Sequence, residues 1–238
     1  MKKRFAAFVS TVLAAVLCAC SAAPKDVLPN KAAQPTEAPT QQAQTTQAAP
    51  TEQPTPEPDL VQQLLEEMTL EQKVGQLFLV RPDSLDLSQT QDQINDAKAD
   101  GVTELTDAMR QTLAEYPVGG VVIFGKNLES PQQITQFLDD LQQASDTPLF
   151  TAIDEEGGLV ARLANNAAFD LPQYESAAAV GTSGNPEDAR AMGRTIGGYL
   201  KEYGFNLDFA PVADVNTNPD NPVIGTRAFS SEPQTAAD

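Results

Sequence analysis

The sequence predicts an α/β fold with a parallel sheet covered by helices, and three observations predict it. Short apolar runs rich in β-branched residues occur at 77–80, 118–124, 148–153 and 206–210, as expected for strands buried on both faces. Stretches with apolar residues at helical spacing lie between several of these runs, and Pro, Asn or Gly marks many of the boundaries. Regular alternation of strand and helix is typical of a parallel sheet.

The first 19 residues are predicted to be a signal peptide. A basic start, residues 2–4, precedes an apolar stretch over 5–19, which as a helix would be about 22 Å long and too short for a bilayer core of about 30 Å. Leu17-Cys18-Ala19-Cys20 resembles the lipobox of bacterial lipoproteins, in which Cys20 would be lipidated. The alternative is an ordinary secretory signal with incidental cysteines. We expect a lipoprotein anchored at the extracytoplasmic face of the cell membrane.

Residues 20–58 are predicted to be the lipidated Cys followed by a disordered tether. Residues 21–58 contain eight Pro, eight Ala, six Thr and six Gln, and only Val27 and Leu28 are large aliphatic residues. Such a composition buries too little apolar area to offset its chain entropy. We therefore place the folded domain at 59–238.

The first part of this domain is predicted to be helical. Residues 60–68 have apolar positions at helical spacing, a second short helix begins at Leu70, and the run 77–80 forms the first strand. Residues 81–104 are polar and receive no assignment, whereas 105–116 again has a helical pattern.

The second part continues the alternation. After the strand at 118–124, Ser130-Pro131 opens a helix, because a capping residue followed by Pro is a common helix start. A strand at 148–153 follows. Asn185-Pro186 opens a helix that runs to about Tyr203 and ends at Gly204, before the strand at 206–210. The buried stripe of the first of these helices is predicted to be Ile134, Phe137, Leu138 and Leu141.

The most unusual residues follow the third strand, as Asp154-Glu155-Glu156-Gly157-Gly158. Ligand sites in parallel sheets lie at the carboxyl ends of strands. Three adjacent carboxylates repel one another unless a cation or sugar hydroxyls lie among them, and the glycines permit close backbone approach or a positive φ. The alternative is a solvated loop. Asp208 is expected to be a structural buried carboxylate, and Asp214 and Asn216 are expected to brace their loop.

Composition excludes several functions. The formal charge is −18 and there is no His, so nucleic-acid binding is disfavoured, and a Ser-His-Asp triad or His-ligated zinc is impossible within these residues. Two Cys cannot form a disulfide scaffold. Nothing in the sequence suggests a metal or organic cofactor.

Four motifs together resemble the N-terminal barrel domain of glycoside hydrolase family 3. They are 67–78, 119–124, 153–158 with Arg162, and 207–216 through 221–225 with Arg227. Within the family, Asn221-Pro-Val-Ile-Gly225 is similar to the β-N-acetylhexosaminidase branch.

The resemblance implies a (β/α)8 TIM-like barrel, of which this chain holds about the first half. It also implies hydrolysis of β-linked N-acetylhexosamine, as in peptidoglycan fragments, by a retaining mechanism. By the same resemblance, Asp154 accepts hydrogen bonds from sugar hydroxyls, and Arg162 and Arg227 line the sugar subsite. The alternative for Arg162 is a structural ion pair with Glu155 or Glu156.

The family's catalytic groups are missing from these residues. Its His-containing acid/base loop follows the fifth strand and its nucleophilic Asp follows the seventh, whereas four strands are predicted here. We therefore assign no catalytic residue and predict an inactive fragment that is marginally stable or self-associating, because half a barrel leaves its interior and two edges uncovered.

Three functions remain to be compared. The preferred one is a membrane-anchored β-N-acetylhexosaminidase, whose parent chain is longer. The second is a non-catalytic sugar-binding surface lipoprotein. The third, a transporter solute-binding lipoprotein, should have two lobes and none of the four motifs.

Overall fold

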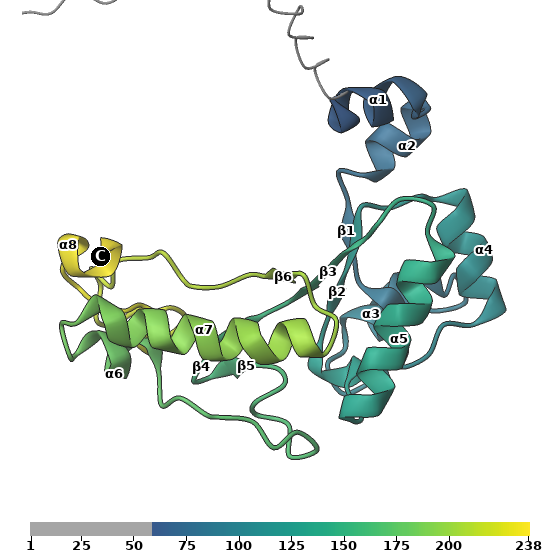
Figure 1. The fold of residues 1–238 in the computed structure, drawn as a ribbon. Coiled ribbons are helices and arrows are strands. Elements are labelled where there is room, and N and C mark those ends of the chain that lie inside the picture. Colours follow the sequence, from purple (N-terminus) through teal and green to yellow (C-terminus); the bar gives the residue numbers. More distant parts are fainter. Residues whose placement is uncertain (1–58) are drawn as a thin grey trace, which may run out of the picture. The chain divides into compact units, whose positions relative to one another are not determined.

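The computed structural model describes residues 59–238, so the predicted signal peptide, Cys20 and tether lie outside the described residues. Four parallel strands form the main sheet in the order β1-β2-β3-β6, which is also their order along the chain (Figure 1). Their bounds are β1 Leu79–Val80, β2 Gly120–Ile123, β3 Phe150–Ile153 and β6 Leu207–Asp208. This confirms the α/β fold with a parallel sheet and includes all four predicted strands.

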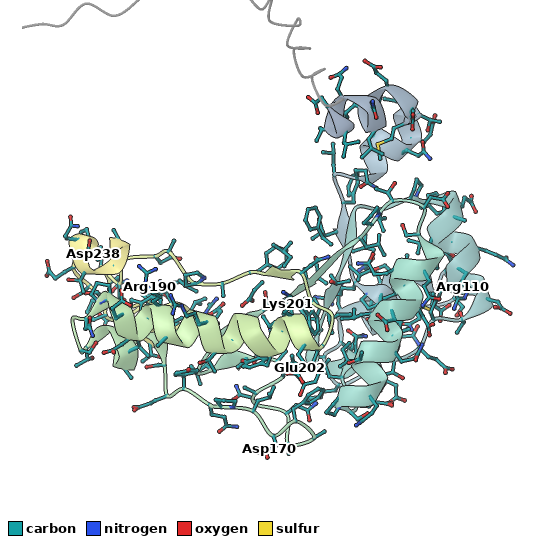
Figure 2. The ribbon with its side chains drawn as sticks, in the orientation of Figure 1. Arg110, Asp170, Arg190, Lys201, Glu202 and Asp238 are labelled. Atoms are coloured by element: carbon teal, nitrogen blue, oxygen red, sulfur yellow. The ribbon has the colours of Figure 1, made fainter. Side chains whose placement is uncertain are left out.

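The predicted helices are present with small shifts at their ends. They are α1 (Leu60–Glu67), α2 (Leu70–Gly75), α4 (Asp107–Glu115), α5 (Pro131–Ala144) and α7 (Pro186–Glu202). Ser130 caps α5 by accepting from the Gln133 backbone N–H at 3.2 Å, and Asn185 caps α7, as predicted. Charged side chains of α7 such as Lys201 and Glu202 are exposed (Figure 2).

Other elements were not predicted. The unassigned stretch 81–104 contains the 3₁₀ turn η1 and the short helix α3, and a small antiparallel hairpin follows β3. The additional elements are η1 (Pro82–Leu85), α3 (Gln91–Asn95), η2 (Gly125–Asn127), β4 (Glu155–Gly157), β5 (Val160–Ala161), α6 (Ala177–Gly181), η3 (Gly225–Arg227) and α8 (Pro233–Ala237).

All four strands are shorter than predicted, and β1 and β6 keep only two residues each. In β1, Leu77 and Phe78 are not strand residues, because their backbone N–H groups donate to the last carbonyls of α2, although the Phe78 carbonyl still accepts from the Gly119 N–H at 2.9 Å. Pro82 then ends β1, since it has no N–H for a ladder. In β6 only Leu207 and Asp208 are strand residues, although the N–H of Phe209 still donates to the Ile153 carbonyl at 2.9 Å.

The hydrophobic core lies between the sheet and its helices. Val121, Ile123 and Ile153 are fully buried on the helix-facing side of β2 and β3. The predicted stripe of α5 is also buried in this core, at Ile134, Phe137, Leu138 and Leu141. Each such side chain contributes about 1.5–3 kcal/mol on burial, so this layer holds the strand ends in place.

The opposite face of the sheet is partly open, in line with the prediction that half a barrel leaves its interior uncovered and against the expectation of strands buried on both faces. Phe150 keeps 52% of its surface exposed and Phe209 keeps 46%. Both residues alternate with the buried helix-facing positions, so they lie on the face that would point into a closed barrel. The described residues therefore cover only about half of each of these side chains.

Helix α1 also lacks the packing that its pattern predicts. None of its residues is buried, and Leu60 and Val61 are about two-thirds exposed. An amphipathic stripe is stabilised mainly by the surface it covers, and the described residues provide none here. Within residues 59–238, no helix combines the length and apolarity needed to cross a bilayer.

Candidate functional site

Asp154 and Arg162, two of the three predicted site residues, form an ion pair. Asp154 directly follows β3, and Arg162 directly follows β5. Nη2 of Arg162 donates to Oδ2 of Asp154 at 2.9 Å, with about a third and a quarter of the two side chains exposed. The alternative partners considered for Arg162, Glu155 and Glu156, are wrong: the hairpin turns Arg162 back toward Asp154. Nε of Arg162 is buried and has no acceptor among the described residues.

Glu155 is a fully buried structural carboxylate. Its oxygens accept from the backbone N–H groups of Leu163 and Ala164 at 2.8 and 2.9 Å, and from the Tyr199 hydroxyl at 2.9 Å. Burial, with the charge of Glu155, raises the pKa of Tyr199 well above its usual range, so the phenol stays protonated and donates. Glu155 therefore ties the segment after Arg162 to helix α7.

Glu156 pairs with Arg227, the third predicted site residue. Nε and Nη2 of Arg227 donate to the two carboxylate oxygens at 2.8 and 2.6 Å, which is a bidentate pair. Glu156 is buried and Arg227, in η3, keeps about a quarter of its side chain exposed. The pair fastens the 221–227 loop to the hairpin after β3.

The three adjacent acids thus do not share one site. Each has its own protein donor: Arg162 for Asp154, backbone amides and Tyr199 for Glu155, and Arg227 for Glu156. The expectation that a cation or sugar hydroxyls must lie among all three is wrong, because each carboxylate has its own donors within the chain. Among the described residues, no three acidic or Cys side chains are grouped as a metal site.

Gly157 and Gly158 have the conformation that the sequence predicts. Their φ values are +82° and +68°, a region that disfavours residues with a Cβ. A Cβ on Gly158 would also lie 2.9 Å from the Glu175 carbonyl oxygen. These glycines let the chain reverse between β4 and β5, which brings Arg162 back to Asp154.

Asp208 is structural, as predicted. Its Oδ1 accepts from the Glu155 backbone N–H at 2.9 Å, which joins the end of β6 to the segment after β3. Burial raises the pKa of Asp208 to about 6, and the Glu155 hydrogen bond opposes that shift. In the following loop, the Asn216 backbone N–H donates to the Ser230 carbonyl at 3.0 Å. Its side-chain Oδ1 is buried without a donor among the described residues, so the side chain does not brace the loop as predicted.

Two residues at the same strand ends were missed by the sequence analysis. Phe124 follows β2, and Arg81 follows β1, at the start of the stretch that received no assignment. Cζ of Arg81 lies 4.2 Å from the centre of the Phe124 ring, and Cζ of Arg162 lies 5.7 Å from it. A single arginine directly after a strand gives no signal of its own in the sequence.

The structure also has a pocket of about 590 Å³, but the predicted site residues do not line it. Its walls come from α7, the segment 210–213 and the residues 235–238, together with Glu155, Glu156 and Asp208. Asp154, Arg162 and Arg227 do not line it. We therefore rest the site on the Asp154–Arg162 pair, because both side chains stay partly exposed at the carboxyl end of β3, whereas Glu155 in that pocket is fully buried.

Known proteins resemble this chain in sequence and in structure. It is 36% identical over 137 residues to Beta-hexosaminidase A of Pseudoalteromonas piscicida, covering 56% of this chain and 23% of that protein. It is 34% identical over 136 residues to a Beta-hexosaminidase of Thiobacillus denitrificans, covering 56% and 37%. The chain thus spans well under half the length of the curated relatives it matches.

Solved structures agree with the sequence matches. A glycoside hydrolase family 3 beta-N-acetylglucosaminidase from Paenibacillus sp. str. FPU-7 has a TM-score of 0.59 and 33% identity, covering 71% of this chain and 29% of that one. A Beta-N-acetylhexosaminidase from Beutenbergia cavernae has a TM-score of 0.56 and 26% identity, covering 72% and 48%. Residues 69–238 match the glycosyl hydrolase family 3 N-terminal domain, and the chain belongs to that family.

Proposed function

We propose that this protein supplies the amino-sugar-binding part of a retaining β-N-acetylhexosaminidase. The observation that carries the proposal is the Asp154–Arg162 pair at the carboxyl end of β3, where parallel sheets bind ligands. A carboxylate accepts from ring hydroxyls, and a guanidinium donates to hydroxyl or amide oxygens. Both side chains stay partly exposed, so a ligand can reach them.

The relatives support the choice of substrate class. The relatives are beta-hexosaminidases and a beta-N-acetylglucosaminidase. We therefore propose β-linked N-acetylhexosamine as the ligand, with Arg227 reaching the same sugar from the 221–227 loop. Its bidentate bond to Glu156 would hold the guanidinium in place.

The 238 residues are proposed to bind but not to hydrolyse. They contain no His, so a His acid/base would have to come from outside them. A non-catalytic sugar-binding role is the second candidate function. The lack of His favours this role for the 238 residues taken alone. In either case Cys20 is proposed to carry a lipid that holds the domain at the extracytoplasmic face of the cell membrane.

A binding and turnover experiment tests the proposal. N-acetylglucosamine should bind the chain with a Kd of about 1 mM, as is common for one small sugar, measured by ligand-observed NMR. A chromogenic β-N-acetylglucosaminide should not be hydrolysed above a buffer blank. Asp154→Asn should weaken binding about ten-fold, because it removes a charged acceptor.

The matched control is Asp170→Asn. Asp170 is an exposed carboxylate on the loop after β5, and Figure 2 shows it far from the main sheet. Its replacement should leave the affinity within two-fold of wild type. Equal affinities for Asp154→Asn and wild type would contradict the site, and turnover that survives repurification would contradict the expectation of inactivity.

A further inference from the structure

Arg81 lies on the same face of the sheet as the proposed sugar site. Val80 pairs with Val121, whose side chain is buried on the helix-facing side of the sheet. Successive residues of an extended chain alternate in direction, so Arg81 lies on the opposite face. By the same alternation Phe124 and Asp154 share that face, since each follows a buried, helix-facing Ile123 or Ile153.

The ring of Phe124 joins Arg81 to the site. Arg81 Cζ is 4.2 Å from the ring centre and Arg162 Cζ is 5.7 Å from it. The two guanidinium carbons are therefore at most about 10 Å (4.2 plus 5.7 Å) apart. A single pyranose ring with a short substituent can bridge such a span. Both contacts are also of the cation–π kind, which stabilises a positive charge beside the ring.

Arg81 differs from the other arginines at these strand ends in its charge balance. Arg162 pairs with Asp154 and Arg227 with Glu156, whereas no carboxylate of residues 59–238 lies within 4.0 Å of the Arg81 nitrogens. The nearby Lys126 is neutralised by the buried Asp83, at 3.1 Å. Arg81 thus has no ion-pair partner among residues 59–238.

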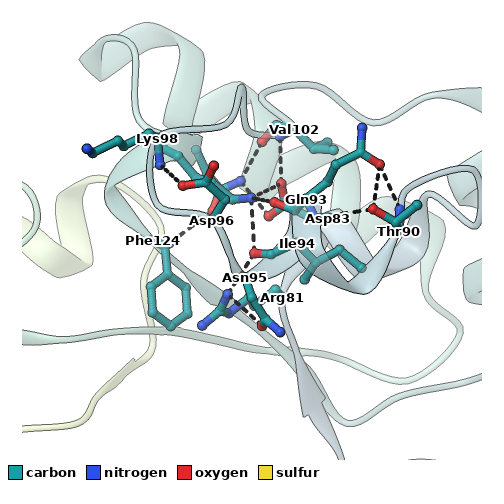
Figure 3. A network of polar contacts seen from close by, with 12 residues as sticks. Arg81, Asp83, Thr90, Gln93, Ile94, Asn95, Asp96, Lys98, Val102 and Phe124 are labelled. Atoms are coloured by element: carbon teal, nitrogen blue, oxygen red, sulfur yellow. Dashed lines mark hydrogen bonds and ion pairs between the residues drawn. The ribbon is translucent and has the colours of Figure 1, made fainter.

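Arg81 is nevertheless held in a fixed orientation. Its Nη1 donates to the Ile94 carbonyl at 2.7 Å and approaches Asn95 Oδ1 at 3.4 Å, as Figure 3 shows. Both acceptors are neutral, and among the described residues all of its hydrogen bonds run through Nη1. Nε and Nη2 therefore remain as donors on a guanidinium that is half-buried and already oriented.

We propose that Arg81 is a specificity-determining residue that binds a carboxylate on the amino-sugar ligand. This rests on the proposed sugar site at Asp154 and Arg162. A planar guanidinium matches a carboxylate with two parallel hydrogen bonds, and its single charge balances a monoanion. Asp154 would accept from hydroxyls of the ring, and a carboxylate on a neighbouring ether oxygen would extend across Phe124 to Arg81.

The test compares two ligands that differ in charge and by one methyl group. N-acetylmuramic acid carries a carboxylate on an ether of N-acetylglucosamine, and its methyl ester has nearly the same shape without the charge. For the wild-type chain the acid should bind about ten-fold more tightly than the ester, because one charge-assisted pair is gained. Arg81→Gln should lower this ratio to about one.

Two further variants keep the test decisive. Arg110→Gln is the matched control, since Arg110 is a partly exposed arginine of α4 with a long 4.0 Å contact to Asp140, and it should keep the wild-type ratio. Arg81→Lys keeps the charge but loses the fork, so its ratio should lie between those of wild type and Arg81→Gln. If a thermal melt shows that Arg81→Gln does not fold, Arg81→Lys replaces it in the comparison.

The outcomes separate this inference from the proposed function. If N-acetylglucosamine binds at Asp154 but the acid has no advantage over its ester, or Arg81→Gln keeps the advantage, the role of Arg81 is refuted and the sugar site stands. If no sugar binds the wild-type chain, both are refuted.

Discussion

Replacing Glu155 with Gln should destabilise the protein more than any other isosteric change near the strand ends. In the native chain Oε2 accepts from the Leu163 N–H, and Oε1 accepts from the Ala164 N–H and the Tyr199 hydroxyl. An amide offers one acceptor and one donor group. Whichever way the Gln side chain turns, its NH2 group meets a donor.

The magnitude follows from these three bonds. In the better orientation the amide oxygen keeps Ala164 and Tyr199, and the Leu163 N–H loses its acceptor. A buried donor left unsatisfied costs about 1–3 kcal/mol, and two charge-assisted bonds become neutral ones at about 1 kcal/mol each. Removing a buried charge offsets part of this loss, which leaves about 2–4 kcal/mol. For a domain of this size that is a fall in Tm of about 5–15 °C.

Urea unfolding and amide hydrogen exchange measure this change. The amides of Leu163 and Ala164 should lose protection in Glu155→Gln, which reports on the site even if the whole chain is marginally stable. Glu187→Gln is the control, because Glu187 is exposed in a 3.1 Å surface pair with Arg190 and should cost less than 1 kcal/mol. An unchanged midpoint and unchanged protection in Glu155→Gln would refute the role assigned to Glu155.

Two other predictions concern the carboxylates beside this network. The pKa of Asp208 is raised from 3.8 to about 6, so the folded state binds its proton more tightly than the unfolded state. The stability that this group contributes should therefore be present below about pH 4 and lost as the pH rises toward 6. Over that pH range Asp208→Asn should become more stable relative to wild type, as measured by urea unfolding. Arg227→Gln should lower the free energy of unfolding by about 2–4 kcal/mol, because it leaves the buried Glu156 carboxylate without its partner. Adding Glu156→Gln to this variant should recover part of the loss, whereas additive losses from the two substitutions would contradict the pairing.

Much of the fold could be predicted because local patterns determined it. Ser130-Pro131 and Asn185-Pro186 are helix starts whose capping bonds need only neighbouring residues, and the strand runs carry their own apolar signal. The hairpin after β3 was not predicted, since β4 and β5 have only three and two residues. The exposure of α1 could not be predicted, because an amphipathic pattern does not reveal whether a partner surface is present.

The sequence predicted which residues form the candidate site better than it predicted their contacts. Asp154 and Arg162 were named from a resemblance, but their pairing depends on the reversal at Gly157 and Gly158, which no spacing rule specifies. The Glu156–Arg227 bond joins residues 71 positions apart, beyond the reach of any local pattern. Arg81 was passed over because a single arginine after a strand gives no signal until Phe124 and Arg162 are seen beside it.

The most direct measurement is an NMR titration of the chain with N-acetylglucosamine, observed at the backbone amides. Shifts centred on Phe124, Asp154 and Arg162 and absent in Asp154→Asn are the predicted result. Shifts confined to α7 and residues 235–238, which line the 590 Å³ pocket, would contradict the account. The absence of a saturable shift at any sugar concentration would contradict it as well.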